Sequence, residues 1–275
     1  MLNLHAARTA AALVAVAAFA GIARADLKIE QTVTVTGENA AELPAGKAAK
    51  PQVSKVFTYY KGDKQRVETA DSIMLYDGAT DTTLYLNPKT KTYFEQVGQA
   101  AAVENKMMDM VKFSGEATVT ETGEEKVIAG KPARHYKYSI NLTLSPKDAN
   151  APAALASFLP SQIITGDLWT TDIPGADLAK RQRSTAILKA LPPGSAEGLK
   201  PVVDKMGSIK GISLDGTQTA RTIYSAAALA QSGETTSPPP LVTQTQTTRI
   251  SEDALPDSYF SLPNGYKKVD PPKRP

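Results

Sequence analysis

The stretch from Val56 to Gln96 constrains the fold most, because turn residues divide it into short runs of strand-forming residues. The breaks at 62–63, 77–80 and 87–90 contain Gly, Asp, Asn and Pro, which suit tight turns. The runs between them are rich in Val, Ile, Tyr, Phe and Thr. No connection is long enough for a crossover helix, so neighbouring strands have to run antiparallel. We therefore predict a meander of about five strands.

The two faces of this meander differ in chemistry. Alternation along the strands places four aliphatic residues on one face, namely Ile73, Leu75, Leu84 and Leu86. The other face carries Met, Tyr and Thr side chains. A sheet that is apolar on both faces has cover on each side, or lines a cavity with one of them. Ordinary two-sided packing explains the same periodicity, so both interpretations stay open.

A second apolar surface is predicted directly after the meander. Between Gln99 and Phe113 the spacing of apolar residues predicts an amphipathic helix, which ends at Gly115. Its apolar stripe consists of Val103, Met107, Met110 and Val111. Because the linker is short, we expect the helix to lie across the aliphatic face of the meander as a plug or lid. The four stripe residues and the four aliphatic residues form the candidate apolar-ligand site, with plain core packing as the alternative.

The rest of the chain also reads mainly as strands. Alternation predicts strands at 26–36, 133–144 and 163–171, with a polar turn at 121–125 between two shorter runs. A helix is predicted after Ser195, and three strands between 209 and 251. The last of these carries few apolar residues, so we expect it at a sheet edge or solvated on one face. Phe260, Leu262 and Tyr266 are candidates to anchor the C-terminal segment.

The first 25 residues have the pattern of a cleaved export signal. Arg8 precedes an apolar run at 10–22, and Ala23-Arg24-Ala25 offers a small-x-small cleavage site. The alternative is an uncleaved membrane anchor, for which the run is short. We therefore expect a signal peptide at 1–25, a single domain at 26–270 and a disordered tail at 271–275.

Composition narrows the location and the partners. The sequence has no cysteine, which excludes a disulfide framework and a lipid-modified cysteine. A periplasmic or secreted protein is the expectation. The formal net charge is +3, and the loss of Arg8 and Arg24 with the leader leaves a nearly neutral chain. This balance gives no reason to expect nucleic acid or an anionic membrane as a partner.

Catalytic and metal-binding patterns are absent from the sequence. His135 is the only histidine after the leader, and we expect it to be a surface or hydrogen-bonded residue. No phosphate-binding loop and no nucleophile-elbow motif occur. We therefore expect no enzyme activity, no catalytic residues, no metal and no cofactor.

Several segments resemble a known group of proteins. They are the runs YYKGDKQRVE at 59–68, SIMLYDGATDTTLYLNPKTKTYFE at 72–95, GDLWTTDIPG at 166–175 and LPDSYFSLPNGYKKV at 255–269. Together they resemble a bacterial secreted family of unknown function that is related to the LolA/LolB/LppX half-barrel superfamily. The resemblance implies a mainly β fold with α (α+β), an incomplete antiparallel barrel of roughly 10–12 strands wrapped around a few helices. The characterised relatives carry lipids or acyl chains in an apolar concavity.

These observations lead to two functional hypotheses. The first is a monomeric, non-enzymatic carrier or sensor of an apolar ligand, such as a lipid or acyl chain, in the bacterial envelope. The second is an envelope interaction or scaffolding module with a packed interior, no ligand and a protein partner. A continuous apolar cavity favours the first, and a dry, packed interior favours the second.

Overall fold

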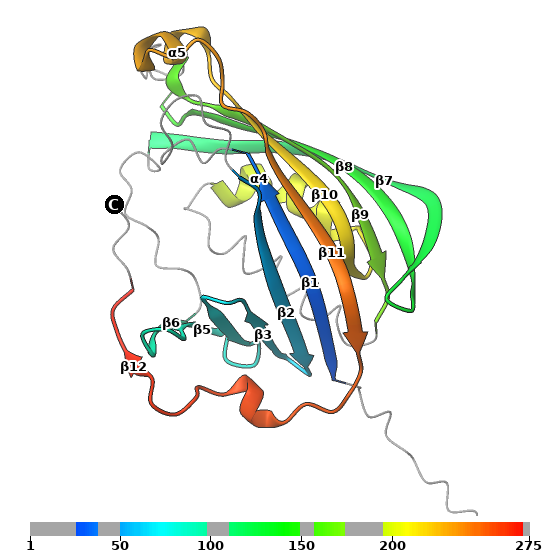
Figure 1. Ribbon diagram of the computed structural model, residues 1–275. Coiled ribbons are helices and arrows are strands. Elements are labelled where there is room, and N and C mark those ends of the chain that lie inside the picture. The colour runs from blue at the N-terminus through cyan, green and yellow to red at the C-terminus, as the bar shows by residue number, and fades with distance from the viewer. Residues whose placement is uncertain (1–25, 38–49, 98–109, 149–156, 174–194, 272–275) are drawn as a thin grey trace, which may run out of the picture.

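A computed structural model describes residues 26–37, 50–97, 110–148, 157–173 and 195–271, and its strands form one open sheet (Figure 1). The sheet has 12 strands in the order β12-β6-β5-β4-β3-β2-β1-β11-β10-β9-β8-β7. Their bounds are β1 (Leu27–Thr36), β2 (Gln52–Lys61), β3 (Lys64–Glu68), β4 (Ile73–Asp77), β5 (Thr82–Asn87), β6 (Thr92–Val97), β7 (Val111–Ile128), β8 (Lys131–Pro146), β9 (Ser161–Thr171), β10 (Ile212–Ile223), β11 (Leu241–Ser251) and β12 (Lys267–Lys268). The described helices are α4 (Ser195–Gly207), α5 (Ala226–Ser232) and the short η1 (Asp257–Phe260). The predicted class, mainly β with α, is confirmed.

The predicted meander is confirmed strand by strand. From β2 to β6 each strand pairs antiparallel with the next one in the chain. Its turns are held by short polar side chains: Asp77 Oδ1 accepts from Ala79 N at 2.9 Å, and Asn87 Oδ1 accepts from Lys89 N at 3.0 Å. Side-chain oxygens of Asp and Asn stabilise such turns by bonding to backbone amides further along the chain.

The two halves of the chain join through β1 and β11. Strand β11 pairs antiparallel with β1 on one side and with β10 on the other. Of the two alternatives predicted for this last long strand, the sheet edge is therefore wrong. The other, solvation on one face, is confirmed, since the exposed side chains of Gln244 and Gln246 lie on a solvated face of the sheet. The real edge beyond β6 is the short β12, which runs parallel to β6.

Strand β7 corrects the predicted helix. Residues 98–109, with most of that helix, lie outside the described residues, but Val111–Phe113 belong to β7 rather than to a helix. Burial alternates along the strand: Val111 and Phe113 are turned inward, whereas Lys112 and Ser114 are exposed. This period of two, which continues to Thr120, is the pattern of a half-buried strand.

The turn predicted at 121–125 is also wrong, because β7 passes through it with a bulge. Glu121 pairs with Tyr136 and Glu125 with Arg134, so Thr122, Gly123 and Glu124 together lie opposite His135. Gly123 adopts a φ of 78°, a conformation that glycine reaches without steric cost. Extra residues on one strand increase the local bend and twist of a sheet.

The described helices differ in their relation to the sheet. Helix α4, predicted from Ser195 onward and observed despite Pro201 within it, packs mainly against β7. Figure 1 shows α4 behind the strands β1, β10 and β11 and the sheet curving around it. Of the three strands predicted after 209, the first two form one continuous strand, β10, and the third is β11. The end of the second predicted strand is helical instead: it belongs to α5, which Ser225 caps by accepting from Ala228 N at 3.1 Å. Among the described residues no helix is both long and apolar enough to span a bilayer.

Two clusters of buried residues hold the described part of the sheet together. The larger one joins the ends of strands that are distant in the sequence, through Leu27, Ile29, Tyr60, Ile128, Ala133, Ile173, Ile212 and Leu214. The smaller one lies in the meander and consists of Ile73, Leu75 and Leu86, with Leu84, Tyr93, Leu262 and Tyr266 packed against it. Burial of such side chains is the main stabilising contribution in a chain without disulfides.

Candidate functional site

The four aliphatic residues of the predicted site form part of the core of the meander. Ile73 pairs with Leu86, and Leu75 with Leu84, so all four lie on one face as predicted. That face is covered by Leu262 and Tyr266 from the C-terminal segment, which runs beside β6 (Figure 1).

The other half of the predicted site is described only in part. Val103 and Met107 lie outside the described residues. Met110 is 50% exposed, whereas Val111 is 1% exposed on β7. Strand β7 is at one end of the strand order, and β4 and β5 are near the other end. Within the described residues, the structure therefore brings together the four meander residues and does not place Val111 beside them.

A different apolar surface lies under α4. Gly115 of β7 lies so close to α4 that an added Cβ atom would come 2.7 Å from Val202 and 3.2 Å from Leu199. The same atom would come 2.9 Å from Leu142 of β8, so Leu142 shares this face. We call it the α4 face.

The α4 face continues across β8 and β9 with buried and partly buried apolar side chains. Ile140 pairs with Ile164, Tyr136 with Leu168 and Tyr138 with Gly166, which places these residues on one face. Ile164 and Leu168 are half-buried. The Tyr138 hydroxyl donates to Gln218 Oε1 at 3.0 Å. Burial, reinforced by the Asp167 carboxylate, raises the pKa of Tyr138, so this hydroxyl stays protonated at neutral pH.

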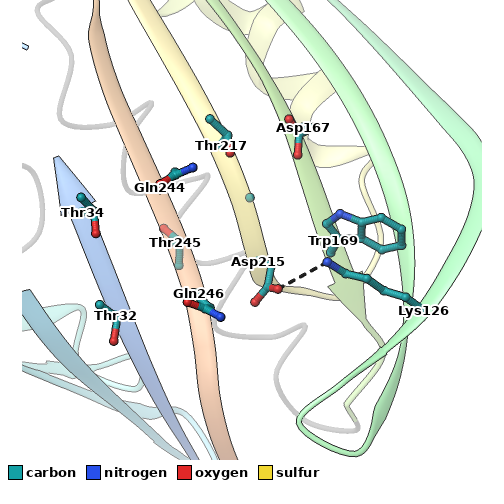
Figure 2. A pocket seen from close by; sticks show the side chains of 11 residues that line it. Thr32, Thr34, Lys126, Asp167, Trp169, Asp215, Thr217, Gln244, Thr245 and Gln246 are labelled. Carbon is teal, nitrogen blue, oxygen red and sulfur yellow. Dashed lines mark hydrogen bonds and ion pairs between the residues drawn. The ribbon is translucent and has the colours of Figure 1, made fainter. Parts of the chain in front are cut away.

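The opposite face of the sheet carries an open pocket of about 280 Å³ (Figure 2). His135 and Leu142 are an odd number of residues apart on β8, so they point to opposite faces. Trp169 pairs with His135, and Asp215 pairs with Trp169, which places both on the face away from Leu142. The pocket is lined by residues of five strands: Thr32, Thr34, Lys126, Asp167, Trp169, Asp215, Gly216, Thr217, Gln244, Thr245 and Gln246.

His135 and Trp169 form one wall beside this pocket. Their rings are stacked, with centres 4.4 Å apart and planes 9° from parallel. The bulge of β7 surrounds the imidazole: Nδ1 lies 2.9 Å from Glu124 Oε2 and 3.2 Å from Thr122 Oγ1. The buried Nε2 has no hydrogen-bond partner among the described residues, and Asp167 Oδ1 is 3.9 Å away. His135 was predicted to be either a surface residue or a hydrogen-bonded one, and the structure shows it buried and hydrogen-bonded.

Lys126 reaches from β7 over Trp169 to β10. Its Nζ atom lies 4.2 Å from the centre of the indole ring and 3.4 Å from Asp215 Oδ2 (Figure 2). The other carboxylate oxygen of Asp215 accepts from Thr247 N at 2.8 Å. Asp215 therefore has a cation and a backbone donor, whereas Asp167, on the neighbouring strand β9, has neither among the described residues.

Sequence reasoning did not identify this pocket. Alternating Thr and Gln residues along β1 and β11 were visible in the sequence, as was Trp169, the only tryptophan. What joins them is the pairing of β11 between β1 and β10, which no local pattern predicts. In the described part of the chain no group of three or more His, Cys, Asp or Glu side chains could hold a metal ion.

The α4 face and the pocket are thus two chemically different surfaces on opposite sides of one sheet. The first is aliphatic and aromatic, and the second is rich in hydroxyl, amide and carboxylate groups. Comparison with known proteins gives no family for the chain, since no protein-family model and no curated protein matches it.

Proposed function

We propose that this protein is an exported, non-enzymatic carrier of an apolar ligand, such as a lipid or acyl chain, which it holds on the α4 face of a LolA-like half-barrel. One observation carries the proposal: α4 packs mainly against β7, at the end of the sheet, while β8 and β9 present half-buried apolar side chains on the same face. An apolar ligand beside α4 would complete the burial of Ile164 and Leu168.

The energetics of such a ligand are favourable. Each methylene group that leaves water contributes about 0.8 kcal/mol, so an acyl chain of ordinary length gains several kcal/mol from burial. Tyr138, with its hydroxyl bonded to Gln218, offers a flat aromatic surface beside the aliphatic residues. A carrier of this kind needs no catalytic group, which agrees with the expectation of no cofactor and no metal.

The second candidate is an envelope interaction module that covers its own apolar surfaces. The observation that favours it is the meander, where Leu262 and Tyr266 already cover Ile73, Leu75 and Leu86. If the α4 face is completed by the chain in the same way, no room for a ligand remains and the partner is a protein.

A titration with a fluorescent dansyl-labelled fatty acid separates the two candidates. We expect saturable binding that Leu168→Asn weakens about tenfold, because a polar amide replaces an apolar contact on the α4 face. Val53→Asn is the matched control: Val53 is 64% exposed and pairs with Thr34, whose side chain lies on the pocket side. Absence of saturable binding, together with absence of lipid in native mass spectra of protein from its source, would favour the interaction module.

The export part of the proposal has its own test. The leader 1–25 lies outside the described residues, and the proposal rests here on the Ala23-Arg24-Ala25 motif. N-terminal sequencing of protein from the periplasm or medium should begin at Asp26. A form that retains the apolar run 10–22 would contradict both the cleavage and the periplasmic or secreted location.

We further propose that the protein is a monomer and binds no nucleic acid. Sedimentation of the mature protein with and without DNA checks both points.

A further inference from the structure

We propose that the pocket on the face opposite α4 binds a neutral, polyhydroxylated ligand the size of one sugar ring, with Asp167 as its principal hydrogen-bond acceptor. The proposal is independent of the apolar carrier, because the two surfaces lie on opposite faces of the sheet. It follows from the chemistry of the lining, the charge balance, and the size of the pocket.

The floor of the pocket consists of side chains that both donate and accept hydrogen bonds. Register pairs Thr32 with Gln246, Thr34 with Gln244, and Gln244 with Thr217, so five hydroxyl or amide groups point to one side of β1, β11 and β10. Hydroxyl and amide groups are complementary to ligand hydroxyls, which also donate and accept. None of these five side chains has a hydrogen bond to another residue in the part of the chain that the structure describes.

The charges in the pocket favour a neutral ligand with O–H donors. Lys126 and the Thr247 amide compensate Asp215, whereas within the described residues no Lys or Arg side chain forms an ion pair with Asp167, and His135 Nε2 is 3.9 Å from its Oδ1. The side chain of Asp167 is 43% exposed, so one free carboxylate faces the opening. A free carboxylate repels anions and accepts strongly from hydroxyl groups. Phosphate and carboxylate ligands are therefore unfavourable here.

Trp169 contributes a fixed donor and a rigid wall. The His135 stack and the Lys126 ammonium group hold the indole, and Figure 2 shows its nitrogen turned toward the strands that line the pocket. The indole N–H can only donate, so it complements a ligand oxygen. Because Lys126 already takes the position over the ring that a ligand cation would occupy, an amine ligand fits less well.

The volume of about 280 Å³ limits the ligand to one ring. Pockets for larger organic ligands extend from roughly this size to several times it. A free monosaccharide and a sugar residue at the end of a longer glycan share this chemistry. The experiment therefore includes both.

Trp169 is the only tryptophan of the chain, so its fluorescence reports on this pocket directly. The mature chain is titrated with glucose, galactose and N-acetylglucosamine, and with a chito-oligosaccharide as the longer glycan. We expect a saturable change of Trp169 emission with at least one monosaccharide. A change with the oligosaccharide alone would also support the pocket and would assign it to the longer glycan.

Three variants test the assignment of the site. Asp167→Asn should weaken the sugar about tenfold, because a charged acceptor becomes a neutral one, and Gln244→Ala should weaken it less. Asp253→Asn removes the same charge from an exposed position outside the pocket and should leave binding unchanged. Thermal midpoints are measured for all three, so that loss of binding is compared only between folded proteins.

Three results would overturn the proposal. They are no saturable change with any of the four sugars, sugar binding that Asp167→Asn leaves unaltered, and saturation by spermidine while every sugar is silent. The last result would assign the pocket to an amine. Because saturation with the fluorescent fatty acid should not alter the sugar titration, failure here and failure of the carrier proposal are distinguishable.

Discussion

His135 lies flat against Trp169, with the ring centres 4.4 Å apart and the planes only 9° from parallel. The two residues are directly paired on β8 and β9, so the stack links the two strands at the wall of the pocket. The bulge of β7 closes around the other side of the imidazole through Glu124 and Thr122. One histidine thus connects three neighbouring strands.

The first prediction concerns the stability that this histidine contributes. His135 is 6% exposed, so His135→Ala removes a stacked pair and a hydrogen bond and leaves a cavity. We expect the free energy of unfolding to fall by about 2 kcal/mol. Urea denaturation measures it, and Lys137→Ala, two residues along the strand and exposed, is the control. A midpoint equal to that of the wild type would mean that the stack does not persist in solution.

Strand patterns were predictable wherever one face of a strand is buried and the other solvated. β1 and the meander fall into this class, because alternation and turn residues agree there. The start of β7 was not predicted as a strand, although its sequence VKFSGEATVT also alternates. Met107, Met110 and Val111 have helical spacing, and this competing period extended the predicted helix into the strand. Local patterns decide an element only when one period prevails.

The pocket could not be predicted, because it depends on which strands become neighbours. Thr34, Gln244 and Thr217 are distant in the sequence and adjacent in space, since β11 inserts between β1 and β10. The polar composition of β11 left an edge strand and a strand solvated on one face as alternatives, and the pairing shows an interior strand. The packing of Leu262 and Tyr266 over the meander also depends on long-range pairing, although the sequence already marked both residues as candidates to anchor the C-terminal segment.

The second prediction tests the C-terminal cover. Tyr266→Ala should expose the cluster of Ile73, Leu75 and Leu86 and lower the free energy of unfolding by about 3 kcal/mol. Val269→Ala, at an exposed position in the same segment, should cost far less. Limited proteolysis gives the second measurement, since loss of the anchor should speed cleavage after 261. Equal proteolysis of both variants would show that the segment is held by β12 rather than by its side chains.

The third prediction concerns alkaline pH. Burial raises the pKa of Tyr138 above its ordinary value of 10.0, and the nearby Asp167 carboxylate adds to the effect. The folded state then keeps the proton of the Tyr138 hydroxyl at a pH where the unfolded state has lost it. Stability from this group is therefore fully present below about pH 10 and declines as the pH rises further. Urea midpoints between about pH 8 and pH 11 should fall, and fall less for Tyr138→Phe. A midpoint of the wild type that stays constant over this range would contradict the prediction.

The last prediction concerns the seat of α4 on β7, on which the carrier proposal depends. A Cβ atom on Gly198 would come 1.9 Å from the Phe113 carbonyl oxygen, which is too close for any contact, whereas a Cβ atom on Gly207 would meet nothing within 4 Å. Alanine favours a helix over glycine by about 1 kcal/mol, so propensity alone predicts that Gly198→Ala stabilises. We expect the opposite sign, a loss of about 2 kcal/mol, because α4 has to move away from β7. Gly207→Ala, in the same helix, should be neutral or slightly stabilising.

Thermal midpoints compare the stability of the two variants. A titration with the fluorescent fatty acid shows whether displacement of α4 alters the affinity of the protein for this ligand. Equal stability of the two variants would place α4 elsewhere than against β7.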